Sequence, residues 1–151
     1  MLAEVLIAVA VVAIGLSALA SAIPVAGAAV SEGARLSTAT FLAAARLEEI
    51  RAATWSATPA VDRLGLSDSL LSPPQSGDTR TFPDEPVLPG PYGGYSRQVR
   101  ILDCGAPPGC GATTSARLRQ VTVTVAYRPV TATGLAAQDK TVLLTTIVTQ
   151  R

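Results

Sequence analysis

The sequence predicts an α+β fold, in which one long N-terminal helix packs on a small antiparallel sheet. Three observations support this fold class. The run from Val5 to Val30 contains no charged residue, and apolar residues then fall to helical spacing as far as about residue 54. After residue 94, three stretches alternate between apolar and polar positions, as strands with one buried face do. Three such strands need a cover for their apolar face, and the helix supplies it.

The uncharged run predicts a hydrophobic helix over residues 1–30. At 1.5 Å per residue, Val5 to Val30 would extend about 39 Å if unbroken. The hydrocarbon core of a bilayer is about 30 Å thick, so the segment is long enough to span a membrane. Two positions, Gly15 and Pro24, predict interruptions in it, because proline lacks an amide hydrogen and clashes with the carbonyl four residues back.

Residues 31–55 continue the helix in amphipathic form and begin the globular part, residues 31–151. The segment is rich in good helix formers and is expected to end near Trp55, with Pro59 beyond it. Its charged residues are Glu32, Arg35, Arg46, Glu48, Glu49 and Arg51. Its apolar residues at helical spacing are Leu36, Ala39, Ala43, Leu47 and Ile50. The chain therefore starts with one helix of about 50 residues, whose second half has a face suited to a sheet.

Residues 56–93 predict a proline-rich loop that packs over the sheet. Its prolines exclude a long helix, although short pieces of helix or strand, for example over residues 61–71, stay open. They are Pro59, Pro73, Pro74, Pro83, Pro86, Pro89 and Pro91.

Residues 94–151 predict an antiparallel sheet of three strands. The first begins at Tyr95, and its alternation places Tyr95, Arg97, Val99 and Ile101 on one face. The other two are expected at about 118–127 and 141–150, where valine and threonine are frequent.

Cys104 and Cys110 enclose Gly-Ala-Pro-Pro-Gly, a spacer that favours a turn. The spacing predicts a disulfide that pins the connection between two strands, since the Cα atoms can approach within bridging distance. Free thiols are one alternative. A zinc site is another, although such a site normally has four Cys or His ligands and this chain has two cysteines and no histidine.

The composition argues against catalysis. The chain contains no histidine, the commonest general base, and no residue pattern that would activate its serines and threonines. A Gly-rich phosphate-binding motif is also absent from the sequence. The spacing of its loop acids does not match an EF-hand, and calcium at Asp84 and Glu85 is the alternative to solvated carboxylates. We therefore expect neither an enzyme nor a bound cofactor or metal.

Net charge gives no support to nucleic-acid binding. Twelve Lys and Arg stand against eleven Asp and Glu, a formal net charge of +1. A local basic patch across paired strands, from Arg97, Arg100, Arg117 and Arg119, is the alternative to ordinary charges on the solvent face. No specific nucleic-acid partner is predicted.

The N-terminus resembles that of type IV pilins and pseudopilins. The resemblance rests on Leu2-Ala-Glu-Val-Leu-Ile-Ala-Val-Ala10 followed by Ile14-Gly15. Residues 42–51 and 121–128 are also similar to minor pilins and the smaller pseudopilins. The resemblance implies the pilin roll as the fold, and a Gly and a Pro at comparable places that let the helix stretch or melt on assembly. It also implies that Glu4 pairs with the N-terminal amine of an adjacent subunit.

One departure concerns the processing site. In the family the first mature residue is usually an N-methylated Phe and the acid is the fifth mature residue. Here the acid, Glu4, is the fourth residue. The mature N-terminus is therefore expected at or just before Met1: a residue precedes Met1, the start codon lies further upstream, or the subunit is processed differently.

The resemblance implies a non-enzymatic structural subunit of a type IV pilus or a type II secretion-type pseudopilus. Its partners would be copies of itself or other pilins in a helical filament, together with a prepilin peptidase and an assembly platform. It would cross the bacterial inner membrane once before assembly and then lie in a cell-surface or periplasmic filament. The alternatives are a membrane-anchored binding domain and a secreted domain cleaved after Ala20-Ser-Ala22.

Overall fold

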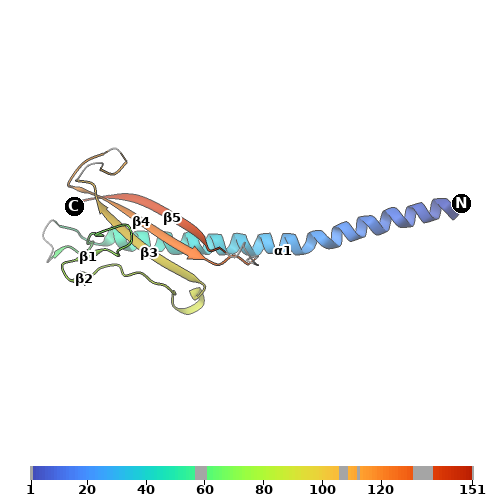
Figure 1. Cartoon of the computed structure of the whole chain (residues 1–151), viewed down its shortest axis with the longest axis horizontal. Helices are drawn as coiled ribbons and strands as arrows, with labels where there is room; N and C mark the ends of the chain where they lie inside the picture. Colours follow the sequence, from blue (N-terminus) through green and yellow to red (C-terminus); the bar gives the residue numbers. More distant parts are fainter. Residues whose placement is uncertain (1, 57–60, 106–108, 112, 131–137, 151) are drawn as a thin grey trace.

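The computed structural model describes residues 2–56, 61–105, 109–111, 113–130 and 138–150. It confirms the α+β class: one long N-terminal helix lies against a three-stranded antiparallel sheet, and a short two-stranded sheet lies beside it (Figure 1). The elements in chain order are α1 (Leu2–Ala52), β1 (Gln75–Ser76), β2 (Thr79–Arg80), the 3₁₀ turn η2 (Gly90–Tyr92), β3 (Tyr95–Asp103), β4 (Leu118–Tyr127) and β5 (Lys140–Thr149).

Helix α1 is a single helix of 51 residues that runs through both Gly15 and Pro24. Figure 1 shows it curving gently along its free half. The two predicted interruptions are therefore not breaks in the helix as it stands, and their opening during assembly stays a prediction. Glu4 in the first turn and Arg51 in the last turn both complement the helix macrodipole.

The second half of α1 packs on the sheet through a stripe of apolar residues. Ala39, Ala43 and Ile50 are completely buried, and Leu42 and Leu47 are nearly so. Their spacing of three and four residues places them on one face of the helix. The two alanines lack bulky side chains, so the helix backbone approaches the strands closely.

The strand order is β3-β4-β5, with every neighbouring pair antiparallel. Along β4 the buried side chains alternate strictly with partly exposed ones, and Val121, Val123 and Val125 are fully buried beneath α1. On β3, Val99 and Ile101 occupy the same inner face, as the alternation predicts. The central strand thus supplies most of the sheet's contribution to the core.

The proline-rich segment covers one edge of the sheet. Glu85 and Arg97 exchange two backbone hydrogen bonds of 2.9 Å, and the amide of Leu88 donates to the Tyr95 carbonyl. Further along β3, the amide of Ser67 donates to the carbonyl of Ile101. The segment also contains β1 and β2, whose connection includes Gly77 at φ +57°, a left-handed conformation that glycine adopts without strain. Four backbone groups on the outer edge of β3 are thereby hydrogen-bonded: the amide and carbonyl of Arg97 and the carbonyls of Tyr95 and Ile101.

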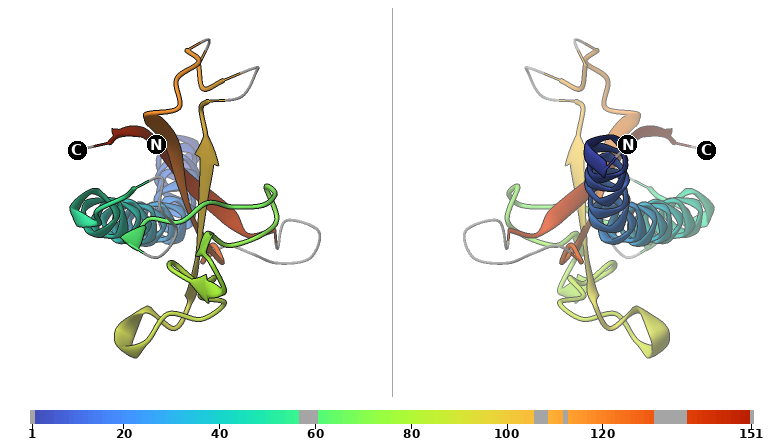
Figure 2. Two further views of the ribbon diagram at one scale, coloured as in Figure 1. Left: turned by 90° about the vertical axis from the view of Figure 1, so that its left-hand side faces the viewer. Right: turned by 90° about the vertical axis from the view of Figure 1, so that its right-hand side faces the viewer.

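The predicted disulfide joins Cys104 to Cys110, with Cα atoms 5.1 Å apart. It closes a small loop within the β3–β4 connection, which extends beyond the sheet (Figure 2). Both cysteines are buried. The bridge therefore holds the start of this connection, and the two cysteines are bonded to each other rather than free.

Replacing both cysteines with serine is expected to lower the free energy of unfolding by about 2–2.5 kcal/mol, since so short a closed loop removes little entropy from the unfolded chain. Urea denaturation of the full chain in detergent, with and without a reductant, measures this. The wild-type protein under reducing conditions should match the double variant. A loss above about 5 kcal/mol would mean that the bridge is needed for the fold itself.

Candidate functional site

The free half of α1 is the largest exposed apolar surface of the described chain. Between Val5 and Val30, every large aliphatic side chain is 60–74% exposed. Figure 1 shows this half projecting from the sheet as a stalk. Exposed apolar surface on this scale marks contact with a membrane or another protein. We call residues 2–30 the stalk.

Among the described residues, α1 is the one helix long and apolar enough to cross a membrane. Its position near the N-terminus also suits a signal sequence, so length and composition leave an anchor and a signal open. Glu4 lies exposed in the first turn of the stalk. Met1, predicted to lie at or next to the mature N-terminus, falls outside the described residues.

A polar junction ties the base of the stalk to the sheet at Glu32. Lys140 Nζ lies 2.7 Å from Glu32 Oε1, and the Tyr127 hydroxyl donates to the same oxygen at 3.0 Å. The amide of Val130 donates to Oε2 at 3.3 Å. Three segments of the C-terminal half thus meet one carboxylate where α1 leaves the sheet.

Titration behaviour follows from these contacts. The hydrogen bond from Lys140 is the largest cause that holds the pKa of Glu32 below its usual value, with further help from Tyr127 and Val130. The same hydrogen bond raises the pKa of Lys140. Burial, followed by the bond to Glu32, raises the pKa of Tyr127. The junction is therefore a charged pair over the whole neutral pH range.

A second cluster joins α1 to the proline-rich segment through Glu85. Arg97 Nε lies 2.7 Å from Glu85 Oε2, and Arg46 Nη2 lies 3.0 Å from the same oxygen. Arg46 is 9% exposed, and its guanidinium carbon lies 5.5 Å from the ring centre of Phe82. Two arginines on different elements thus share one carboxylate. Desolvation by burial raises the pKa of Glu85, but the bonds and charges of Arg97 and Arg46 outweigh it, so the net pKa is lowered.

Acidification is expected to destabilise the domain through Glu85 and Glu32. Their folded pKa values lie below the ordinary 4.5. Each therefore stabilises the fold above that unfolded value, and the stabilisation is lost as pH falls through the folded pKa. The midpoint of urea unfolding should be flat near neutrality and fall below about pH 4.5.

The matched comparison for this pH dependence uses Glu85→Gln, which removes one titrating group. This variant should be less stable than wild type at pH 7, and its stability should fall less steeply with acidification. Parallel curves for the two proteins would contradict the assignment of this pH dependence to Glu85.

A buried ion pair fixes the segment that follows α1. Arg119 Nη1 lies 2.7 Å from Asp62 Oδ2, and both side chains are 7% exposed. The Arg119 guanidinium also lies 4.2 Å from the ring centre of Trp55. The pair thus links β4 to the connection after the helix.

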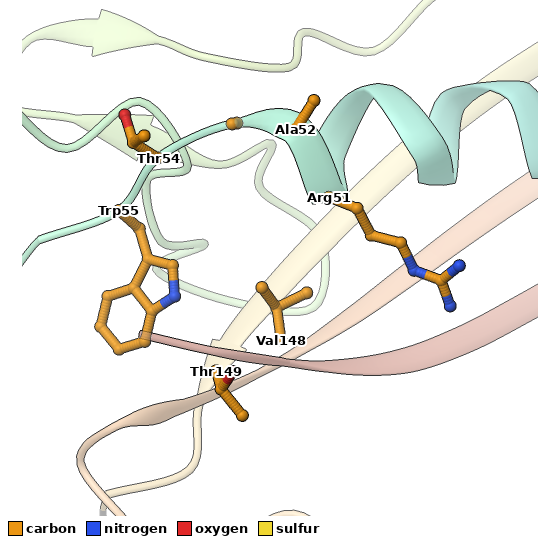
Figure 3. Close-up of a pocket in the computed structure, with 7 residues that line it drawn as sticks. Arg51, Ala52, Thr54, Trp55, Val148 and Thr149 are labelled. Atoms are coloured by element: carbon orange, nitrogen blue, oxygen red, sulfur yellow. The ribbon is translucent and has the colours of Figure 1, made fainter. Parts of the chain in front are cut away.

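Trp55 lines a shallow pocket at the end of α1 (Figure 3). Arg51, Ala52, Thr54, Val148 and Thr149 form the rest of the labelled wall. Within the described residues, the indole Nε1 is buried and has no hydrogen-bond partner. The polar side chains of the lining are Arg51, Thr54 and Thr149, and none of the lining residues is a histidine or a carboxylate that could act as a general base.

The basic patch that the sequence left open is not formed by the described side chains. Arg119 and Arg97 point to the inner side of the sheet and are ion-paired there. Arg100 lies on the outer face but binds both oxygens of Asp84, at 2.6 and 2.9 Å. Arg117 alone of the four is exposed without an ion pair among the described residues. Three of the four charges are thus structural.

The ion pairs of Asp84 and Glu85 also concern the calcium site that the sequence left as an alternative at these two residues. The carboxylates of Asp84 and Glu85 are held by arginines rather than grouped with each other. Within the described ranges, no group of three or more His, Cys, Asp or Glu side chains is placed to hold a metal ion.

Sequence reasoning missed the roles of Glu32, Asp62 and Glu85. Their partners lie 108, 57 and 12 residues away in sequence, so no local pattern pairs them. One signal was available: Glu32 is the first acid after the uncharged run, at the point where α1 must leave an apolar environment.

Comparison of the chain with protein-family models, with curated proteins and with solved structures finds no match.

Proposed function

We propose that this chain is a structural subunit of a type IV pilus or a type II secretion-type pseudopilus. The observation that carries the proposal is the stalk, an exposed apolar helix that starts with an acid and continues without a break into the core of the globular domain. The chain would assemble by burying this helix among the helices of neighbouring subunits.

The apolar surface of the stalk suits two environments in succession, a membrane and then the core of a filament. Before assembly, its exposed side chains suit the hydrocarbon of an inner membrane, which they are long enough to cross. After assembly, the same side chains would pack against other stalks. Because apolar surface is removed from water in both places, transfer between them has no large hydrophobic cost. The disulfide is consistent with a domain outside the cytoplasm.

Glu4 would supply the directional contact. A carboxylate in an apolar environment is costly unless it is paired, and at the bilayer centre the cost is about 2.5–3.5 kcal/mol. In a bundle of stalks, the N-terminal amine of an adjacent subunit would neutralise it. The pairing selects a defined axial offset between neighbours, which apolar packing alone does not.

The fold around the stalk supports a passive role for the domain. The ion pairs of Glu32 with Lys140 and of Arg46 with Glu85 join α1 to the sheet and to the proline-rich segment, and the pair of Asp62 with Arg119 joins the connection after α1 to β4. The domain would be carried outward on the filament surface while the stalks bundle inside. A prepilin peptidase and an assembly platform would process and insert the chain, and no catalytic step belongs to it.

Mass spectrometry of the N-terminal peptide, on protein recovered from sheared cell-surface material, tests the proposal. An N-methylated residue at or just before Met1, in material that contains filaments, is the expected result. A peptide beginning at Ile23 would overturn the proposal in favour of a secreted domain. An intact stalk found only in membranes, never in filaments, would indicate an anchored binding domain instead.

A further inference from the structure

Strand β5 is the open edge of the main sheet. The opposite edge, on β3, is covered by backbone hydrogen bonds from Ser67, Glu85 and Leu88. Among the described residues, β5 pairs with β4 alone, and no other backbone group bonds to it between Lys140 and Thr149. Between Thr141 and Thr149 the strand contains no proline, glycine or charged residue, the usual devices that protect an edge from pairing. Its one charge, Lys140 at the first position, lies on the helix side and is paired with Glu32.

The sequence of β5 reads almost the same in both directions. Thr-Val-Leu-Leu-Thr-Thr-Ile-Val-Thr, residues 141–149, is nearly symmetric about Thr145. Suppose that a second copy pairs antiparallel with Thr145 opposite Thr145. At the two ends of the strand Thr141 then lies opposite Thr149 and Val142 opposite Val148, and nearer the centre Leu143 lies opposite Ile147. The one unlike pair is Leu144 opposite Thr146. A strand of this kind is self-complementary.

The faces and the charges of β5 agree with that register. Leu143 and Ile147 lie on the outer face, 60% and 47% exposed, while Val142, Leu144 and Val148 pack toward the core. Because opposite residues in an antiparallel pair lie on the same face, outer residues meet outer residues. No like charges meet, since Lys140 falls opposite Gln150 and is already paired with Glu32. The surface thus suits a second copy of the same chain.

We propose that β5 pairs with β5 of a second copy about a two-fold axis through Thr145. Such a contact would be isologous: the same patch serves both partners. It would extend the three-stranded sheet into one of six strands and satisfy the open edge groups of both copies.

The direction of β5 decides where the second copy lies. Lys140 contacts Glu32, and Thr146 contacts Arg51, so β5 runs in the same direction as α1. Antiparallel pairing therefore points the two stalks in opposite directions. Two copies in one membrane, or two neighbours in one polar filament, cannot meet in this way. On the proposed function, on which this step rests, the contact joins copies in two filaments that lie side by side and run in opposite directions.

Cysteine cross-linking of the full chain in detergent tests the pairing without any filament. Thr145→Cys should form a disulfide-linked dimer under mild oxidation, because residue 145 faces its own copy at about 4.5–5.5 Å between Cα atoms. Thr141→Cys alone should not, since the two copies of residue 141 would be about 26 Å apart. A mixture of Thr141→Cys and Thr149→Cys chains should cross-link. Each variant must first show an intact Cys104–Cys110 bridge.

Two results would overturn the pairing. One is a Thr145→Cys chain that stays monomeric, and the other is a Thr141→Cys chain that cross-links equally well, as in non-specific aggregation. A charge exchange gives an independent measurement. Thr145→Lys and Thr145→Glu chains should each be monomeric, and their mixture should form the dimer.

Electron microscopy of cells that express Thr145→Lys separates this inference from the proposed function. Filaments should still form but should lose lateral association with neighbours of opposite direction. If bundles of filaments were as frequent as in wild type, the proposed contact between neighbouring filaments would be overturned. An absence of filaments in the wild type would count against the proposed function and leave the detergent result standing.

Discussion

On the proposed function, replacing Glu4 with leucine is expected to leave the chain folded and inserted in membranes while its content in filaments falls about a hundredfold or more. The change would remove one partner of a buried charge pair and leave the adjacent N-terminal amine unpaired, at a cost of about 3–5 kcal/mol per contact. Each 1.4 kcal/mol corresponds to about a tenfold change in an association constant. The subunit content of sheared filaments, relative to membranes, measures the effect.

The control for Glu4→Leu is Asp78→Ala, which removes an acid from the exposed turn between β1 and β2, far from the stalk. This variant should assemble as the wild type does. Glu4→Ala should behave like Glu4→Leu, because the charge and not the side-chain size is at issue. Unchanged filament content in both Glu4 variants would exclude the charge-pairing role.

Replacing Arg119 with methionine is expected to lower the free energy of unfolding of the domain by about 3–5 kcal/mol. The change leaves Asp62, whose side chain is 7% exposed, as a buried carboxylate without its cation. It also removes the guanidinium from the face of Trp55. Urea denaturation of the full chain, followed by tryptophan fluorescence, measures the loss and reports directly on the affected ring.

Two further variants test whether the loss of stability comes from leaving a charge unpaired in a buried place. The double variant Arg119→Met with Asp62→Asn should recover much of the loss, because no unpaired charge is then buried. Arg51→Met, which breaks the exposed pair with Glu48 and the exposed hydrogen bond to Thr146, should cost much less, about 1 kcal/mol. Equal losses in the Arg119 and Arg51 variants would contradict the distinction between buried and exposed pairs.

The main elements were predictable because their signals are local and repeated. The long helix follows from an uncharged run and from helical spacing sustained over about fifty residues. Its end, predicted near Trp55, falls at Ala52. The strands at Tyr95 and Leu118 begin where alternation begins, and β5 differs by one residue at each end from the predicted 141–150. The disulfide was predictable from a short spacer between the two cysteines present.

The remaining features depend on contacts between distant residues. Strands β1 and β2 have two residues each, too few for any periodic signal, and they lie in a segment where prolines dominate the pattern. Arg119 and Arg97 lie at positions that alternation places on the inner face, but the rule for apolar faces does not predict which acid will neutralise an arginine there. Asp62 and Glu85 come from loops whose course the sequence does not specify.

The placement of the Glu32 junction has a mechanical consequence. One end of the sheet is tied to α1 at Glu32, and the contact of Arg51 with Thr146 lies about 29 Å further along the helix. Tension applied along the stalk would therefore load the seam between helix and sheet in shear, so that its contacts resist together instead of opening one after another. Single-molecule pulling of wild type and Glu32→Gln would measure this as a lower rupture force in the variant. Because the sheet is held to α1 at both ends of this seam, the domain would move together with its stalk when the filament is pulled.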